Sequence, residues 1–192
     1  MQIERIFSNV EARWLAVLRG AVTRGVKNPL HFGLPRRLRV ARLQAGLGRQ
    51  PLSLAARLGN TAVRSIEVEQ RVPSVETIEK LAAVLRVSPC FLSFGVERPF
   101  DERALGRTSQ LAPRLRAARE QCGLSLNALA KASGVARTMI GYIESGDTMP
   151  SLATVELLAS ALRVSVCWLA FAEGDAALPP RKEPSHPEPD SV

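Results

Sequence analysis

An internal duplication constrains the fold of this chain more than any other feature of its sequence. The dipeptides Gly46-Leu47 and Gly123-Leu124 lie 77 residues apart, and the same offset aligns both flanks without a gap. The matched pairs that follow include Ile66 with Ile143, Glu67 with Glu144, Pro73 with Pro150, Ser74 with Ser151, Cys90 with Cys167 and Phe94 with Phe171. Because each copy is long enough for a compact unit, the chain is expected to contain two similar domains.

Each copy has the apolar spacing of short helices, and the second copy shows it more clearly. Leu111, Leu115 and Ala118 recur at helical spacing, and Gly123 stands where a left-handed residue ends a helix. Ser125 is placed to cap a second helix. No segment alternates in the manner of a strand, so we predict an all-α protein with two tandem five-helix domains.

The same patterns divide the 192 residues into five segments. These are an N-terminal amphipathic helix with its connector (1–33), a first domain (34–95), a linker (96–110), a second domain (111–173) and a proline-rich tail expected to be disordered (174–192). The net charge of +8 favours a polyanionic partner. The first domain carries ten basic and four acidic residues and the second six and five, so the excess lies mainly in the first.

Composition also excludes several classes of protein. No stretch approaches the roughly 18 apolar residues of a membrane span, and Glu4 and Glu11 argue against a targeting peptide, so we expect a cytoplasmic protein without membrane contact. Cys90, Cys122 and Cys167 form no CxxC pair, and the chain has two histidines, so no metal or other cofactor is expected. We interpret the three cysteines as reduced and mostly buried.

The second copy carries a recognisable motif. The segment from Gly123 to Val135 reads GLSLNALAKASGV and is followed at characteristic distances by Ile140, Glu144, Gly146, Pro150 and Leu158. It resembles the lambda-repressor and Cro helix-turn-helix proteins (XRE family), and residues 34–95 resemble them with lower quality. The resemblance implies a five-helix bundle whose third helix enters the major groove of DNA. It also implies structural ion pairs of a helix-one arginine with a helix-three glutamate, namely Arg42 with Glu67 and Arg119 with Glu144.

The third helix of the second copy supplies the main candidates for base contact. Ile140 and Ile143 are expected to face the core. Of the remaining positions, those that share one face of the helix are Arg137, Thr138, Gly141 and Tyr142. Arginine can donate two hydrogen bonds to guanine, Thr138 offers a hydroxyl or a methyl group, and Gly141 allows close approach of the backbone. Tyr142 is also placed to reach a phosphate. The structural alternative is a solvated helix face.

Phosphate contacts are assigned to basic residues on both copies. The candidates are Arg36, Arg37, Arg39, Arg49, Arg114, Arg116 and Lys131. For the last three, ordinary solvated charges are an equal alternative. The second copy also has Leu126 where family members often place a phosphate-contacting glutamine.

The first copy departs from the motif at its turn. In the ungapped register, Arg57 replaces the turn glycine Gly134 and Ser53 replaces Ala130, so this turn is suspect. A shifted register would instead use Leu54-Ala55 and Gly59. In the ungapped register the residues that would face DNA are Asn60, Thr61, Arg64 and Ser65. The alternative is a degenerate copy kept for packing or assembly.

The N-terminal segment contains an apolar seam with alternating spacings of four and three residues. Its members are Ile3, Phe7, Val10, Trp14 and Val17. Two interpretations stay open, docking on the first domain and a homodimer seam. Membrane association is not expected, because the polar face is mixed in charge.

Together these features predict a DNA-binding transcription regulator, a repressor, that uses both units on a multi-part operator in double-stranded DNA. The alternative is an antitoxin-like or co-regulatory module in which one unit binds a protein partner. No pairing of nucleophile and base and no phosphate loop is evident, so an enzyme is not expected.

Overall fold

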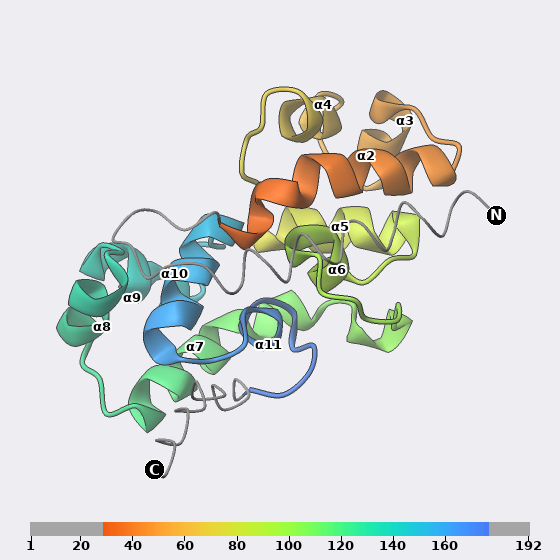
Figure 1. The fold of residues 1–192 in the computed structure, drawn as a ribbon. Coiled ribbons are helices and arrows are strands. Elements are labelled where there is room, and N and C mark those ends of the chain that lie inside the picture. Colours follow the sequence, from red (N-terminus) through yellow and green to blue (C-terminus); the bar gives the residue numbers. More distant parts are fainter. Residues whose placement is uncertain (1–28, 177–192) are drawn as a thin grey trace, which may run out of the picture.

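The computed structural model describes residues 29–176, and these form ten α-helices in two sets of five (Figure 1). The first unit contains α2 (Leu34–Gln44), α3 (Arg49–Ala55), α4 (Ala62–Glu67), α5 (Val75–Leu85) and α6 (Pro89–Phe94). The second contains α7 (Leu111–Gln121), α8 (Leu126–Ser133), α9 (Arg137–Ser145), α10 (Leu152–Leu162) and α11 (Val166–Phe171). Within the described range there is no strand, so the all-α prediction is confirmed. The predicted N-terminal seam and most of the tail lie outside the described residues.

Serine caps define where the helices begin. Ser125 accepts a hydrogen bond from the amide of Ala128, as its position in the sequence predicts. Ser74 and Ser151 cap α5 and α10 by accepting from the amides of Thr77 and Thr154. Each such cap satisfies a backbone donor that the first helical turn leaves free.

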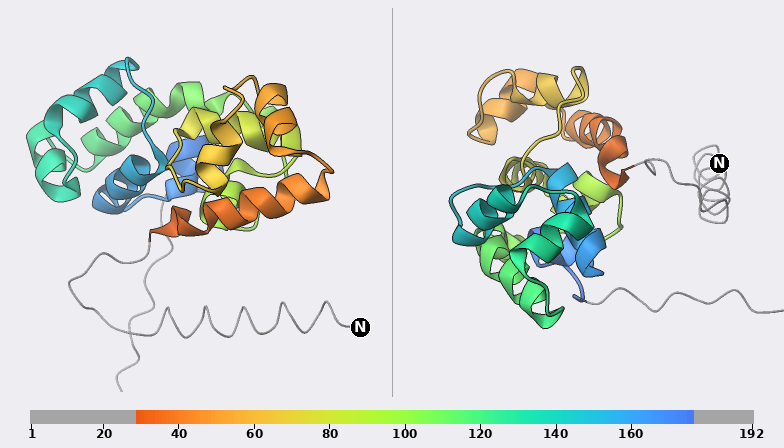
Figure 2. Two further views of the ribbon diagram at one scale, coloured as in Figure 1. Left: turned by 90° about the horizontal axis from the view of Figure 1, so that it is seen from above. Right: turned by 90° about the vertical axis from the view of Figure 1, so that its left-hand side faces the viewer.

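Two helical units share one hydrophobic core. Leu38 and Ile78 of the first unit and Leu115 and Ile140 of the second are fully buried, and the buried apolar residues of both units belong to one continuous cluster. The rings of Phe94 and Phe171 meet with centroids 6.2 Å apart. The two domains therefore pack as one body, as the two views in Figure 2 show.

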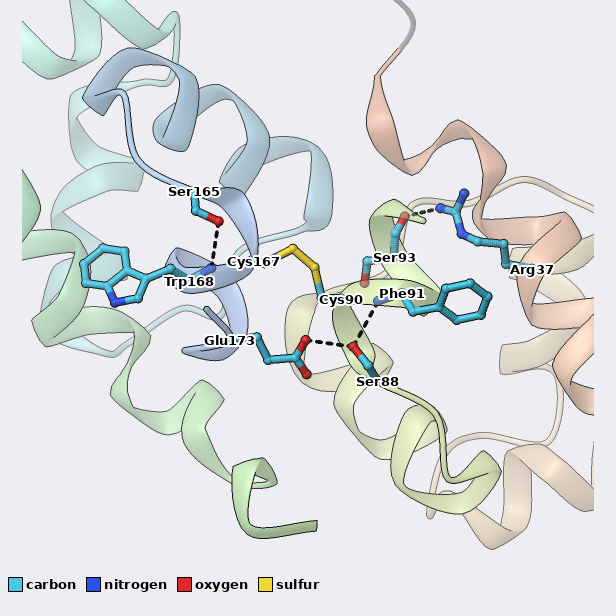
Figure 3. Close-up of a disulfide and its surroundings, with 9 residues drawn as sticks. All are labelled: Arg37, Ser88, Cys90, Phe91, Ser93, Ser165, Cys167, Trp168 and Glu173. Atoms are coloured by element: carbon cyan, nitrogen blue, oxygen red, sulfur yellow. Dashed lines mark hydrogen bonds between the residues drawn. A yellow bond between two sulfur atoms is a disulfide. The ribbon is translucent and has the colours of Figure 1, made fainter. Parts of the chain in front are cut away.

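The cysteines differ from the sequence prediction. Cys90 of α6 and Cys167 of α11 form a disulfide between the units, with Cα atoms 5.4 Å apart (Figure 3). Cys122 is free and exposed at the end of α7. The prediction of reduced cysteines is wrong for Cys90 and Cys167, while Cys122 is free as predicted. The prediction of mostly buried cysteines is confirmed, because Cys90 and Cys167 are buried. The pairing depends on how two distant copies pack, which the absence of a CxxC motif does not reveal.

The segment predicted as a linker is also more structured than expected. It contains two short 3-10 helices, η2 (Glu102–Ala104) and η3 (Arg107–Gln110). Thr108 is buried against Glu79 of α5 and donates its hydroxyl to that carboxylate. A similar 3-10 turn, η1 (Leu30–Gly33), precedes α2. Turn η1 leads into α2 and turn η3 leads into α7. Each of these two turns contacts a helix of the other unit, η1 through Glu156 of α10 and η3 through Glu79 of α5.

Candidate nucleic-acid interface

Helix α9 lies at the left of Figure 1, and polar side chains of this helix are exposed to solvent. Gly134, with a φ of 74°, ends α8 in the left-handed region, and α9 starts three residues later. Ile140 and Ile143 are buried and hold the inner side of α9 against the core. On the outer side Arg137, Thr138 and Tyr142 are exposed, and Gly141 is half-buried. The predicted base-contacting residues therefore lie on one accessible surface.

Gly141 has no packing role within the chain. A Cβ atom added there would meet no heavy atom within 4 Å. The open space above its backbone is compatible with close approach by another molecule. Met139, which was not among the predicted contacts, is 40% exposed on the same helix. Met139 precedes the buried Ile140 in the sequence. Because successive side chains of a helix point about 100° apart, Met139 can face solvent while Ile140 faces the core.

The predicted structural ion pair of the second unit is present. Arg119 of α7 donates to the Glu144 carboxylate from Nε at 2.7 Å and from Nη2 at 2.9 Å. Its Nη1 donates to the carbonyl of Leu124, which links the pair to the start of the helix-turn-helix. The Glu144 side chain is 5% exposed. This bidentate contact ties the C-terminal part of α9 to the first helix of the unit.

The first unit repeats this arrangement and extends it. Arg42 donates to Glu67 at 2.7 and 3.0 Å, and Arg49 of α3 donates to the same carboxylate at 2.8 Å. Burial alone would raise the pKa of Glu67, but the hydrogen bonds from Arg42 and Arg49 outweigh it and lower that pKa. Glu67 is therefore an ionised anchor at the end of α4.

Two predicted phosphate contacts have a different role in the structure. Arg37 donates to the carbonyls of Leu92 and Ser93 at the end of α6. Its equivalent Arg114 donates to the carbonyls of Leu169 and Ala170 at the end of α11. Burial lowers the pKa of each to about 10.

These two assignments are corrected for that reason. Arg37 and Arg114 satisfy helix C-terminal carbonyls that lack a partner within the helix. The sequence does not distinguish them from their exposed neighbours because arginine serves both purposes. Their guanidinium groups are therefore engaged within the chain.

The other predicted phosphate residues are exposed. Arg36, Arg39 and Lys131 make no ion pair with the described part of the chain, whereas Arg49 contacts Glu67 and Arg116 donates to the carbonyl of Glu144. The Arg116 guanidinium also lies 3.7 Å from the Glu144 carboxylate. Arg49 and Arg116 thus border the ends of α4 and α9 while keeping much of their side chains in solvent.

The turn of the first unit forms in the ungapped register. Leu52 is fully buried at the position equivalent to Leu129, and Leu54 is exposed, which contradicts the shifted alternative. Arg57 adopts a φ of 54° where the second unit has Gly134. The suspected defect is therefore accommodated by a strained arginine.

A buried serine supports that turn. Ser53 donates to the carbonyl of Arg49 and accepts a hydrogen bond from the amide of Val63 at 3.1 Å. This hydroxyl joins α3 to the start of α4. A serine at this position is therefore a structural replacement for alanine, since its polar atom is satisfied in the interior.

The four candidates of the first unit do not all lie on α4. Asn60 and Thr61 precede the helix and are exposed, Arg64 is exposed on it, and Ser65 is half-buried. The Ser65 hydroxyl donates to the carbonyl of Ala62 at 2.8 Å. Arg64 is thus the most accessible long polar side chain on this shorter helix.

Residues 29–176 show neither a membrane span nor a metal site. No helix in this range is long and apolar enough to cross a membrane. The same residues contain no group of three or more histidine, cysteine, aspartate or glutamate side chains able to hold a metal ion.

Comparison with known proteins agrees with the arrangement of the helices. A family model described as helix-turn-helix matches the chain twice, at residues 38–92 and 115–169. Comparisons with curated proteins and with solved structures give no significant match. The two matched segments together cover more than half of the sequence, and each spans the helix-turn-helix of one unit. The chain therefore belongs to the lambda-repressor type of helix-turn-helix family and carries two tandem copies of this DNA-binding domain.

Proposed function

We propose that this chain is a cytoplasmic, sequence-specific transcription regulator that acts as a repressor and uses both helix-turn-helix units on one operator. The observation that supports this most directly is the exposed face of α9. Arg137, Thr138 and Tyr142 are accessible there, although the rest of the helix is anchored by Ile140 and Ile143. An operator-bound protein represses simply by occupying the DNA that polymerase must use.

In this proposal the side chains of α9 have separate roles. Arg137 donates to the N7 and O6 atoms of a guanine, and Thr138 contacts a neighbouring base edge. Met139 offers an apolar contact to a thymine methyl group, and Tyr142 donates to a phosphate. The buried pair of Arg119 and Glu144 holds α9 at a constant angle to α7, which supports a defined docking geometry.

Phosphate contacts are proposed for the exposed cations. The set is Arg36, Arg39, Arg49, Arg116 and Lys131, with Arg64 of α4 serving base or phosphate contact. Neutralising roughly six phosphates would give a slope of about −5 when log affinity is plotted against log salt concentration. The first unit contributes most of this term because it holds most of the excess positive charge.

One observation favours a second candidate function, binding of a protein partner by the first unit. Several apolar side chains of this unit and of the preceding turn η1 are exposed, namely Leu30, Phe32, Val40, Leu43 and Leu54. Apolar groups of this size suit a protein contact better than a phosphate backbone. The occupant would be another protein, as in antitoxin-like regulators, or the chain's own N-terminal seam.

The proposed function is tested by measuring the affinity of the full chain for a pool of genomic DNA fragments over a range of salt concentrations. We expect the protein to retain a subset of the fragments at salt concentrations at which most other fragments dissociate. Equal affinity for all fragments at every salt concentration would contradict sequence-specific regulation. A stoichiometric protein partner whose binding is lost in Leu43→Ser but kept in Arg137→Ala would support the second candidate.

A further inference from the structure

The contacts between the two units are reciprocal under the 77-residue offset. The amide of Val75 donates to the carbonyl of Pro150 at 3.0 Å, and the amide of its equivalent, Leu152, donates to the carbonyl of Pro73 at 3.1 Å. Between these bonds Ser74 forms an antiparallel bridge with Ser151. A reciprocal pattern of this kind characterises a two-fold interface between identical subunits.

Two carboxylates at the interface show the same reciprocal pattern, one buried and one half-buried. Glu156 accepts hydrogen bonds from the amide and Nδ1 of His31, both at 2.8 Å. Its equivalent, Glu79, accepts from the amide and hydroxyl of Thr108, the residue equivalent to His31. Each unit therefore holds the 3-10 turn that leads into the first helix of the other unit.

These contacts define a pseudo-two-fold axis inside one chain. A residue that contacts its own equivalent must lie beside the axis, as Ser74 does with Ser151 and Cys90 with Cys167. The paired serines and the disulfide therefore both lie beside this axis. The loops that carry the serines come directly after α4 and α9, the helices that carry the candidate base contacts (Figure 1).

A two-fold relationship gives α4 and α9 the same inclination to the axis. Their exposed residues are therefore related by the same axis. The disulfide, the paired loops and the continuous core hold the two helices at one separation. Two-fold helix-turn-helix dimers use this geometry to enter successive major grooves on one side of the duplex.

The symmetry of the backbone is not matched by the exposed side chains. Arg137 is equivalent to Asn60, Gly141 to Arg64 and Tyr142 to Ser65, and only Thr138 and Thr61 are alike. Asn and Arg present different hydrogen-bonding groups to base edges. A pseudo-symmetric pair with these two surfaces fits two unequal half-sites.

We propose that one chain alone acts as a complete two-headed reader, whose operator contains two different half-sites with centres about one helical turn, ~10 bp, apart. This inference rests on the proposed function and specifies its DNA ligand. It makes the operator non-palindromic and the stoichiometry one chain per operator. The interface that a dimer would form between subunits is already formed within the chain.

The test selects bound duplexes from a random DNA pool with the full oxidised chain and then determines the mass of the complex. We expect one chain per duplex and two dissimilar sequence blocks. Inserting about 5 bp between the blocks places them on opposite sides of the duplex, and affinity should fall roughly 100-fold. Replacing the same central base pairs without changing their number is the matched control and should have a much smaller effect.

Three outcomes would overturn the inference. Two chains on a palindrome would show that the axis lies between chains. Selection of a single sequence block, with an affinity for the duplex that the insertion does not change, would show that only one unit contacts bases. Both of these leave sequence-specific binding, and so the proposed function, intact. Absence of any selected sequence would contradict the proposed function and the inference together.

Discussion

Glu156 on α10 accepts hydrogen bonds from both the backbone amide and the Nδ1 atom of His31, 125 residues earlier in the chain. Glu79 makes the equivalent contacts with Thr108. These two carboxylates join the units through groups that are largely removed from water. The interface is therefore specified by polar contacts as well as by the shared core.

Removing the Glu79 carboxylate should destabilise the protein. In Glu79→Ala the hydroxyl and amide of Thr108 lose their acceptor in a buried setting, which costs about 1–3 kcal/mol. The matched control is Glu76→Ala on the same helix, whose exposed pair with Lys80 contributes at most about 1 kcal/mol. The measurement is urea-induced unfolding, and equal losses in the two variants would contradict the assigned role.

Arg119→Ala should have a larger effect than Arg116→Ala. The first change leaves the buried Glu144 carboxylate without its bidentate partner, and a loss of about 3–5 kcal/mol is expected. The Arg116 side chain is 55% exposed, and its contact with Glu144 is 3.7 Å, so its loss should cost under about 1 kcal/mol. Unfolding free energies of the two variants make the comparison. A larger loss for Arg116→Ala would show that the wrong arginine was identified as the anchor of α9.

The paired state of Glu67 predicts how stability depends on pH. Because its folded-state pKa lies below the ordinary value of 4.5, the stabilisation is fully present above that value and is lost as pH falls through the folded pKa. The unfolding free energy should decline between about pH 5 and pH 2. In Glu67→Gln this part of the pH dependence should disappear. An unchanged acid slope in that variant would contradict the ion pair with Arg42 and Arg49.

The disulfide predicts one reactive thiol per unreduced chain. Alkylation before reduction should modify Cys122 alone, and alkylation after reduction and unfolding should modify all three cysteines. The 77-residue separation corresponds to about 4 kcal/mol of stabilisation in the chain-entropy model. Cys90→Ser should lose this contribution, whereas Cys122→Ser should not. Three modified thiols in the native, unreduced protein would disprove the bond.

Gly141→Ala separates folding from DNA binding. Alanine meets no atom of the chain and favours a helix more than glycine, so the protein should gain about 0.5–1 kcal/mol of stability. If DNA approaches the backbone at Gly141, the added methyl group should nevertheless weaken specific binding. Fluorescence anisotropy with a selected duplex measures the second effect. Greater stability with unchanged affinity would remove Gly141 from the contact surface.

The repeat and the motif were sufficient to predict the helices and the ion pairs of Arg42 and Arg119. Both depend on residues that are close in sequence or on a pattern shared by related domains. The disulfide and the capping role of Arg37 were missed, because these depend on which surfaces of distant segments meet. Spacing along the chain carries little information about such contacts.

The same distinction applies to the first unit. The sequence identified the unusual residues Ser53 and Arg57 but did not show that they preserve the turn. The turn depends on the hydrogen bond that the amide of Val63 donates to Ser53 and on the left-handed backbone of Arg57. Neither feature produces a periodic pattern of apolar residues in the sequence, so neither could be predicted from it. The 77-residue offset already places His31 and Thr108 at equivalent positions. Only the structure shows that these two residues have the same role, because each donates hydrogen bonds to a glutamate of the other unit.

Sequence selection from a random DNA pool, performed with the wild type, Arg137→Ala and Arg64→Ala, tests the central claim most directly. We predict that Arg137→Ala relaxes the preference at one block of the operator and that Arg64→Ala relaxes it at the other, with about 1–3 kcal/mol lost for each arginine that contacts a guanine. Identical selected sequences from all three proteins would contradict base recognition by α9 and α4.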